Sequence, residues 1–369
     1  MNSILMETRI ERSGLAGIAE KVESGERLSF DDGVLLYTTP DLTSVGALAD
    51  NVRTRLHGDV AYFNRNMHLN YSNICALSCK FCAFGQKEGD ELAYRFDLEE
   101  IRRRMEAIKN RPVTEVHIVG GLDPKLPWEF YLDMLRLIKE IKPEIKIKAF
   151  TSIEIDFFSK KFRKTHEEIL SELMEVGLDT MPGGGAEVFS ENVREELYKR
   201  KLNVDGWLTV AKTAHRMGLK TNCTMLYGHI ESVEDRVNHL CTLREAQDET
   251  GGMQAFIPLA FHPENTQLSH LPHTSGFLDL RTVAVSRLML DNIPHIKAYW
   301  IMLGTKVAQL ALSYGANDVD GTVTEETIVK MAGGKTRGEL NTDELLYLIR
   351  DAGYRPVERD SVYNVIREY

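Results

Sequence analysis

The chain has 369 residues, of which 43% are hydrophobic and 27% are charged, and its formal net charge at pH 7 is −10. This composition is typical of a soluble globular protein, and an acidic balance without a long basic run argues against nucleic-acid binding as the main activity. We find neither a signal-like apolar core nor an apolar run of bilayer length, so we expect a cytoplasmic protein without a membrane partner.

Residues 1–60 predict a helical extension that covers one end of the main domain. Apolar side chains recur at helical spacing over Leu15–Val22 and again over Leu42–Val52. Gly25 ends the first pattern, and Asp31–Gly33 predicts a turn between the two helices.

From residue 67, short apolar or β-branched runs alternate with amphipathic segments, as in a parallel sheet with crossover helices. Eight such runs over about 250 residues favour a (β/α)8 barrel, with a six-stranded partial barrel as the alternative. The candidate strands are Met67–Tyr71, Glu115–Val119, Lys146–Ser152, Leu178–Pro182, Leu219–Met225, Gln254–Leu259, His295–Met302 and Asp318–Thr322. The clearest helical patterns are Leu98–Ile108, Ile169–Val176, Trp207–Met217, the segment from Ser232 onward, and Val307–Tyr314.

Residues 323–369 contain one further helical pattern, from Thr342 to about Ala352, followed by a short tail. We therefore predict three parts. These are an N-terminal helical extension (1–60), a barrel (61–322) and a C-terminal helical closing segment (323–369).

The densest chemical signal is a C-x3-C-x2-C motif formed by Cys75, Cys79 and Cys82. Thiolates so close on one loop can bind soft iron. Clusters that only carry electrons usually take four protein thiolates, so three ligands predict a 4Fe–4S cluster with one open iron. A structural zinc site would need a fourth ligand, and His68 lies too early to be an obvious one. A disulfide is disfavoured because the other two cysteines are isolated in the sequence.

Ligands bind at the carboxyl ends of the strands in a parallel barrel, and the cysteine loop follows the first strand there. Gly120 and Gly121 follow the second strand, where they either let the backbone approach a ligand or form an ordinary turn. Glu154 follows the third. It is suited to an ammonium or a ribose hydroxyl if buried, or else it faces solvent in the first turn of a helix.

Three consecutive glycines, Gly183–Gly185, follow the fourth strand and form either a bare floor for a flat ligand or a flexible loop. Glu187 closes this stretch and could hold a ribose or move a substrate proton. The fifth strand carries Asn222, Thr224 and Tyr227, which offer hydrogen bonds.

His229, after the fifth strand, could move a proton near neutral pH. The sixth strand is followed by His262, Glu264 and Asn265, a polar cluster suited to adenine, ribose or substrate contacts. Cys223 and Cys241 are expected in the core.

The cysteine loop, with Phe81 in the aromatic position before Cys82, resembles the signature of the radical S-adenosylmethionine superfamily. The resemblance implies that the cysteines hold a 4Fe–4S cluster whose open iron is chelated by S-adenosylmethionine, and that Gly120 and Gly121 meet the methionine ammonium. Reduction of the cluster then yields a 5′-deoxyadenosyl radical.

Longer strings are similar to those of the aminofutalosine synthase family over nearly the whole chain. They are His68–Cys75, His117–Leu122, Pro182–Glu187 and Gln254–Pro263. Relatives commonly have histidine where this chain has Asp123, which weakens any role for that residue. The resemblance implies that the adenosyl radical adds to the enolpyruvyl double bond of 3-[(1-carboxyvinyl)oxy]benzoate. Rearrangement and decarboxylation then give 6-amino-6-deoxyfutalosine and methionine, on the futalosine route to menaquinone.

The alternatives are a dehypoxanthine futalosine cyclase, a deazaflavin-cofactor synthase and, from another class, an iron–sulfur electron carrier. We expect an aromatic dicarboxylate substrate, an electron donor such as flavodoxin or ferredoxin, and a homodimer as one possible assembly. The candidate catalytic residues are His229, Glu187 and Tyr227. The candidate cofactor-binding residues are Phe81, Gly120, Gly121, Glu154, Gly184 and Glu187. The candidate substrate-binding residues are Asn222, Thr224, His262 and Asn265.

Overall fold

The computed structural model describes residues 3–369, with side chains described from Met6 onward. Its centre is a seven-stranded sheet in which neighbouring strands are parallel and their spatial order follows the chain. The strands are β2 (Asn66–Leu69), β3 (Glu115–Ile118), β4 (Lys146–Ala149), β5 (Leu178–Met181), β6 (Lys220–Tyr227), β7 (Met253–Ala260) and β8 (His295–Ile296).

The segment 318–324 joins the two edges of this sheet. It begins with β9 (Asp318–Gly321), which forms one isolated bridge to Lys297 just after β8. Thr324 forms a second isolated bridge, to Met67 in β2. The predicted α/β fold is thus confirmed, with seven strands in continuous pairing and the eighth linked through single bridges.

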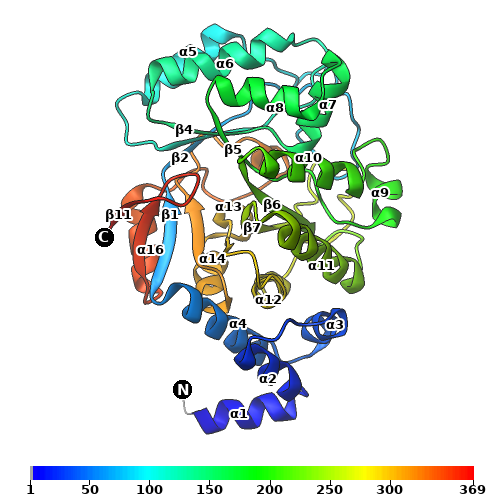
Figure 1. Cartoon of the computed structure of the whole chain (residues 1–369), viewed down its shortest axis with the longest axis vertical. Helices are drawn as coiled ribbons and strands as arrows, with labels where there is room; N and C mark the ends of the chain where they lie inside the picture. Colours follow the sequence, from blue (N-terminus) through cyan, green and yellow to red (C-terminus); the bar gives the residue numbers. More distant parts are fainter. Residues whose placement is uncertain (1–2) are drawn as a thin grey trace.

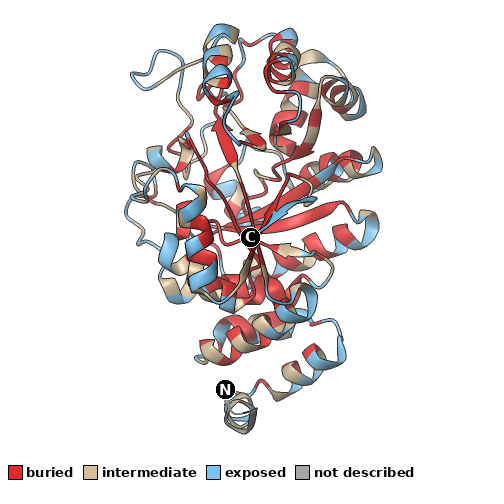
Figure 2. Cartoon of the chain, turned by 90° about the vertical axis from the view of Figure 1, so that its left-hand side faces the viewer, coloured by how far each residue is buried: buried red, intermediate tan, exposed pale blue. Residues whose placement is uncertain are grey.

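Helices cover the outer face of the curled sheet (Figure 1). One apolar cluster packs β2–β5 against the helices α5 (Leu98–Ile108), α6 (Trp128–Ile141), α7 (Ser152–Phe162) and α8 (His166–Glu175). A larger one packs β6–β8 against α10 (Val204–Arg216), α11 (Val233–Thr250) and α12 (Gly276–Met289). Figure 2 shows buried residues concentrated on the strands and on the inner faces of these helices. In α5, for example, Asp97 caps the first turn and Ile101, Met105 and Ile108 form the buried stripe.

Residues 3–57 form four helices at one end of the molecule (Figure 1). They are α1 (Ser3–Arg12), α2 (Ala16–Ser24), α3 (Phe30–Thr38) and α4 (Leu42–His57). The turn predicted at Asp31–Gly33 is wrong because these residues lie in the first turns of α3. Ser29 and Asp32 form a reciprocal capping box that starts this helix. The third of these residues is a glycine because a side chain at Gly33 would collide with Val237 of α11.

Two predicted strands are too long. The third ends at Ala149 because Thr151 and Glu154 form a capping box that starts α7. The seventh ends at Ile296, and the chain then enters the short helix α13 (Trp300–Leu303).

The C-terminal part contains the predicted helix as α16 (Thr342–Asp351), together with two strands that the sequence pattern did not indicate. The strands β10 (Arg355–Arg359) and β11 (Val365–Glu368) form a second sheet in the order β11-β10-β1-β9, in which β1 is Val60–Asn64. Ser361, after β10, donates to Glu115 at the start of β3 (2.7 Å) and accepts from Gln254 near the start of β7 (2.6 Å). The tail therefore closes the amino-terminal end of the ring.

The remaining helices are short: α9 (Glu191–Leu197), α14 (Thr305–Ala311), the 3-10 helix η1 (Leu312–Tyr314) and α15 (Ile328–Met331). Within residues 3–369, none of the helices combines the length and the apolar character needed to cross a membrane.

Candidate functional site

The cysteine loop follows β2 and is fastened to the turn that follows β3. Gly121 donates its backbone N–H to the Ser72 carbonyl (2.7 Å), and Ala76 donates to the Leu122 carbonyl (3.0 Å). Cys75 in turn donates to the Gln86 carbonyl (2.9 Å). These hydrogen bonds hold the loop at the carboxyl end of the ring, where the sequence predicted it.

The three thiols are free and half-buried, and they lie close enough to influence one another electrostatically. Burial raises the pKa of Cys79 to about 12, and the charges of Cys82 and Cys75 add to this rise. Burial also raises the pKa of Cys82, although the Gly85 N–H donates to its sulfur at 3.3 Å. Three neighbouring thiols that lack disulfide partners fit a shared metal cluster, because metal coordination deprotonates a buried thiol.

A buried ion pair that the sequence did not reveal lies beside these thiols. Lys201 pairs with Glu187, and its ammonium lies 5.3 Å from the centre of the Phe81 ring. Its positive charge lowers the pKa of both Cys79 and Cys82, which opposes the effect of burial. Lys201 therefore favours the thiolate form that binds metal. Glu187 and Phe81 come together here, but the Glu187 carboxylate is already neutralised by its partner.

Glu154 is buried, so the solvent-facing alternative is wrong. Its Oε1 accepts from the Tyr71 hydroxyl (3.0 Å) and the Gly120 N–H (3.1 Å), and its Oε2 accepts from the Thr151 N–H (2.8 Å) and hydroxyl (2.9 Å). Burial raises its pKa to about 7 despite these four donors. The carboxylate thus ties the Gly120 turn to α7.

The paired glycines after β3 are required by packing within the protein. A side chain at Gly120 would collide with the Tyr71 ring, and one at Gly121 would collide with the Ile74 carbonyl of the cysteine loop. The two glycines therefore allow the turn after β3 to pack closely against the cysteine loop.

The glycines after β5 are not equivalent. A side chain at Gly183 would strike the Asn222 backbone, and one at Gly185 would strike Ile153. A Cβ at Gly184 would meet nothing nearer than the Thr151 methyl group, at 3.3 Å, and this residue is half-buried. Only Gly184 keeps the open surface expected of a ligand floor.

The interior of the ring is polar, and several of its buried side-chain atoms lack a partner among the described residues. Lys148 is paired with Glu115 at 2.7 Å, and Thr224 donates to the Gly183 carbonyl at 3.2 Å. Asn222 accepts from Gln254 at 3.2 Å but leaves its own N–H2 group free. Further buried unpartnered atoms around the ring interior include His68 Nε2, Asn70 Oδ1, Glu115 Oε1 and Gln254 Oε1. Unpaired buried polar atoms are costly, so such a group is typical of a site completed by ligand or water.

Lys297 is the least satisfied cation of this interior. Only 1% of its side chain is exposed, and the nearest carboxylate oxygen, Asp320 Oδ1, lies 3.6 Å away, beyond hydrogen-bond distance. Burial lowers the pKa of the neighbouring His68 to about 4, and Lys297 contributes to the decrease. Lys297 directly follows β8, and the register places it level with Ile257 in the middle of β7, where its charge reaches Glu115 at the start of β3. A polar period-two pattern in β2 (Asn66, His68) and the residue after it (Asn70) could have revealed this polar interior from the sequence.

The structure does not bring Tyr227 and His229 to this interior. Tyr227 donates to Asp279 of α12 (2.8 Å), so it faces the helix layer. His229 contacts the Leu226 carbonyl (3.1 Å) through Nε2 and Glu231 (2.9 Å) through Nδ1. Both ring nitrogens of His229 are thus occupied by local partners.

His262 and Asn265 lie on the loop after β7. His262 donates to the Met302 carbonyl (3.1 Å), and Asn265 is exposed and donates to the Met331 carbonyl (2.9 Å). Asp123 forms a bidentate pair with Arg95, with both distances 2.7 Å, and accepts from Ser72 at 2.8 Å. Asp123 therefore anchors the cysteine loop.

Comparison with known proteins agrees with this geometry. The chain matches the family model of the radical SAM superfamily over residues 69–242 and that of the CofH/MqnC C-terminal region over residues 250–368. Its fold is similar to that of methylornithine synthase, with a TM-score of 0.72 at 19% identity, over 91% of this chain and 95% of that one. The class is therefore an α/β radical SAM enzyme that uses a 4Fe–4S cluster and S-adenosylmethionine.

Two relatives define the family more closely. Aminodeoxyfutalosine synthase from Thermus thermophilus is 47% identical over 96% of this chain and 96% of its own length. Cyclic dehypoxanthine futalosine synthase from Halalkalibacterium halodurans is 38% identical over 96% of this chain and 95% of its own. The chain belongs to the family of radical SAM enzymes that includes aminodeoxyfutalosine synthase.

Proposed function

We propose that this chain is an aminofutalosine synthase of menaquinone biosynthesis. The reaction joins the adenosyl group of S-adenosylmethionine to the enolpyruvyl carbon of 3-[(1-carboxyvinyl)oxy]benzoate. Rearrangement and loss of a carboxyl group as bicarbonate give 6-amino-6-deoxyfutalosine and methionine. The observation that carries the proposal is the 47% identity to aminodeoxyfutalosine synthase across the whole barrel, against 38% for the cyclase.

In this proposal the cysteine loop holds the cluster through Cys75, Cys79 and Cys82. When bound, the cluster and S-adenosylmethionine supply the adenosyl radical. Lys201 stabilises the thiolates, and the Phe81 ring lies against this cation. The backbone at Gly120 and Gly121 would meet the methionine group of the bound cofactor. Glu154 positions Gly120 through its hydrogen bond to that N–H.

Gly184 provides the open floor on the other side of the ring for the adenosyl group. Glu187 acts through Lys201 in this scheme, because its carboxylate forms the ion pair described above. We assign no proton transfer to Tyr227 or His229, whose polar atoms are occupied by their neighbours.

We assign the substrate carboxylates to the polar interior. A carboxylate needs donors, and the strongest are cations and amide groups that no protein acceptor has taken. Lys297 has no hydrogen-bond partner among the described residues, and the Asn222 N–H2 group is free. Thr224 lies two residues beyond Asn222 on the same strand, but its hydroxyl already donates to the Gly183 carbonyl (3.2 Å), so we assign no carboxylate to it.

The related alternatives share the barrel and the cofactors, so the product separates them. A dehypoxanthine futalosine cyclase would release free 5′-deoxyadenosine, and a deazaflavin-cofactor synthase would require tyrosine. An iron–sulfur electron carrier would consume no S-adenosylmethionine, and its barrel would have no need of unpaired donors.

The test is anaerobic reconstitution with iron and sulfide, followed by S-adenosylmethionine, the enolpyruvyl benzoate and a reductant. Reduced flavodoxin or ferredoxin is the donor we expect in the cell. Mass spectrometry should show a product in which the adenosine carbon is joined to the arene, formed in step with methionine. Release of 5′-deoxyadenosine without such a product would refute the proposal. The elution volume of the same sample in size-exclusion chromatography tests whether the chain forms a homodimer.

A further inference from the structure

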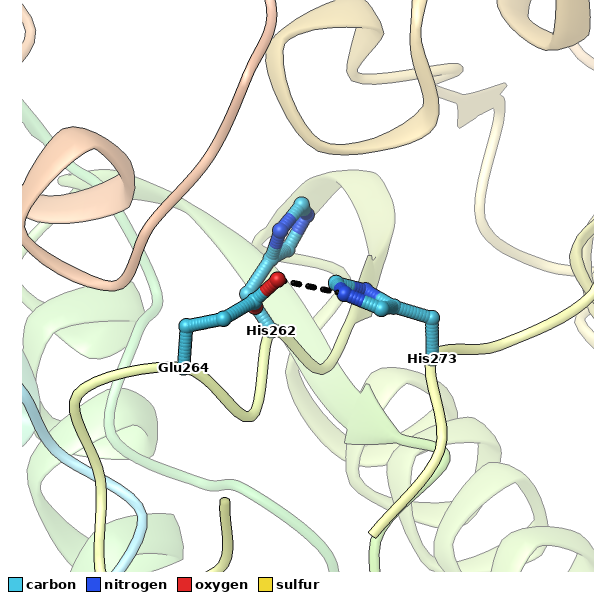
Figure 3. A group of neighbouring side chains, drawn as sticks. All are labelled: His262, Glu264 and His273. Atoms are coloured by element: carbon cyan, nitrogen blue, oxygen red, sulfur yellow. Dashed lines mark hydrogen bonds and ion pairs between the residues drawn. The ribbon is translucent and has the colours of Figure 1, made fainter. Parts of the chain in front are cut away.

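A second group of possible metal ligands lies on the loop between β7 and α12. His262, Glu264 and His273 each present a ligand atom, and the three atoms lie within 4.8 Å of one another. Figure 3 shows the three side chains converging, with His273 Nε2 2.6 Å from Glu264 Oε1. This group is separate in sequence from the cysteine loop.

The orientation of His262 is fixed by its contact with α13. Its Nε2 lies 3.1 Å from the Met302 carbonyl oxygen, which can only accept a hydrogen bond. Nε2 therefore carries the proton, and Nδ1 presents a lone pair. This Nδ1 is buried and has no partner among the described residues. A backbone carbonyl that holds the second nitrogen of a metal-binding histidine is a common feature of protein metal sites.

Glu264 also has a buried acceptor atom without a hydrogen-bond partner among the described residues. Its Oε1 accepts from His273, while its Oε2 is buried and unpartnered within the described part of the chain. Two acceptor atoms from neighbouring side chains are thus withdrawn from water without a donor between them, which is unfavourable for both. A cation between them would satisfy both atoms.

The surroundings suit an ion that enters from solvent. The His273 side chain is 53% exposed, so it can turn from its hydrogen bond toward an incoming ion. Glu264 is held from the other side, because a side chain at Gly333 would collide with its Cβ. One fixed imidazole, one fixed carboxylate and one mobile imidazole make a site that can close around a metal.

We propose that His262, Glu264 and His273 bind one divalent zinc-class ion, which fastens the β7–α12 loop at the mouth of the barrel. Two imidazoles and one carboxylate form a ligand set that zinc uses with an open fourth position. Its bonds of about 2.0–2.2 Å require the three ligand atoms to close slightly, which the exposed His273 permits. The site shares no ligand with the cysteine cluster, although its loop contacts the cysteine loop, where the Gln267 N–H donates to the Lys80 carbonyl (3.0 Å).

Zinc binding is measured on the anaerobically reconstituted protein, so that the cysteines are already occupied by iron. Equilibrium dialysis against zinc should give one tightly bound ion per chain with unchanged iron content. Glu264→Gln and His273→Gln should each weaken binding at least about 10-fold to 100-fold, as loss of groups at a metal site typically does. His270→Gln is the matched control, because His270 is an exposed histidine of the same loop outside the group.

X-ray absorption at the zinc edge identifies the ligands directly. The spectrum should show nitrogen and oxygen neighbours at about 2.0–2.1 Å and no sulfur near ~2.3 Å. The proposal is overturned if the Glu264→Gln/His273→Gln double variant binds as much zinc as the unmodified chain. It is also overturned if sulfur surrounds the ion, or if manganese binds more tightly than zinc. None of these outcomes depends on whether 6-amino-6-deoxyfutalosine is formed.

Discussion

Replacing Lys297 by methionine should weaken substrate use far more than it weakens the fold. The substitution keeps an unbranched side chain and removes an ammonium that donates no hydrogen bond to the described residues. A charge-assisted hydrogen bond to a substrate carboxylate is worth about 1.5–3 kcal/mol. At about 1.36 kcal/mol per factor of ten, Lys297→Met should lower kcat/KM by roughly 10-fold to 150-fold. Steady-state product formation, with iron content matched between the two proteins, measures this loss.

Lys148→Met is the matched control because it removes the other lysine of the ring interior. Lys148 donates to Glu115 at 2.7 Å, and both side chains are almost fully buried. Its loss leaves a carboxylate buried without its cation, which costs about 3–5 kcal/mol in free energy of unfolding. Lys297→Met should cost less than about 2 kcal/mol, since its nearest carboxylate oxygen is 3.6 Å away. Equal losses of stability in the two variants, or an unchanged kcat/KM for Lys297→Met, would show that Lys297 is a structural cation.

Three further predictions concern the cofactor end of the barrel. Replacing any one of Cys75, Cys79 and Cys82 by alanine should reduce bound iron after reconstitution to a small fraction, whereas Cys241→Ala should leave the iron content unchanged. Lys201→Gln should shift cluster assembly to higher pH, because Lys201 lowers the pKa of Cys79 and Cys82, and an unshifted pH profile of iron incorporation would contradict this role. The pKa of Glu154 is about 7 in the folded protein and 4.5 for the ordinary group. Protonated Glu154 therefore stabilises the fold fully below pH 4.5, and this stabilisation is lost as pH rises through 7. The free energy of unfolding should fall by up to about 3 kcal/mol over that interval, and Glu154→Gln should remove this part of the pH dependence in denaturant titrations.

Helices and strands that follow from a local pattern of apolar residues were predictable from the sequence. The alternation of apolar runs gave the positions of β2–β9, though not those of β1, β10 and β11, and Gly25 ended α2 as expected. The misplaced boundaries come from side-chain capping. Asp32 and Glu154 each start a helix by accepting a backbone N–H of a residue three positions earlier. The sequence pattern around Asp32 predicted a turn, and the pattern before Glu154 predicted a longer strand, so neither helix start was predicted.

The candidate site was predictable only where one segment carries the signal. The cysteine spacing lies within eight residues, so it identified the loop and the cofactors. Lys201 could not be found in this way, because it reaches Glu187 and the thiols from the loop after α9, at no strand end. The same limit applies to Tyr227, whose direction depends on the position of Asp279 in α12. Contacts between distant segments require the fold before they can be identified.

The charges inside the ring explain why we propose Lys297, and not Lys148, as the partner of a substrate carboxylate. Lys148 and Glu115 form a tight pair at 2.7 Å, and Arg359 and Asp318 form another at 2.6 Å. Burial raises the pKa of Asp318, yet the charges of Arg359 and Lys297 bring it to about 2, so this carboxylate stays ionised and bound to its arginine.

The remaining cation, Lys297, faces a carboxylate at 3.6 Å that already accepts from Asn66 at 3.3 Å. At 3.6 Å from its nearest carboxylate oxygen, the buried Lys297 ammonium recovers little of the hydration energy that it lost on burial. A substrate carboxylate that bound to it would supply the missing interaction, and a neutral substrate would not. The anion must approach from the carboxyl end of β8, because Ser361 and the C-terminal tail close the opposite end. The same end carries the cysteine loop, so in this proposal the anion enters the ring past that loop to reach Lys297.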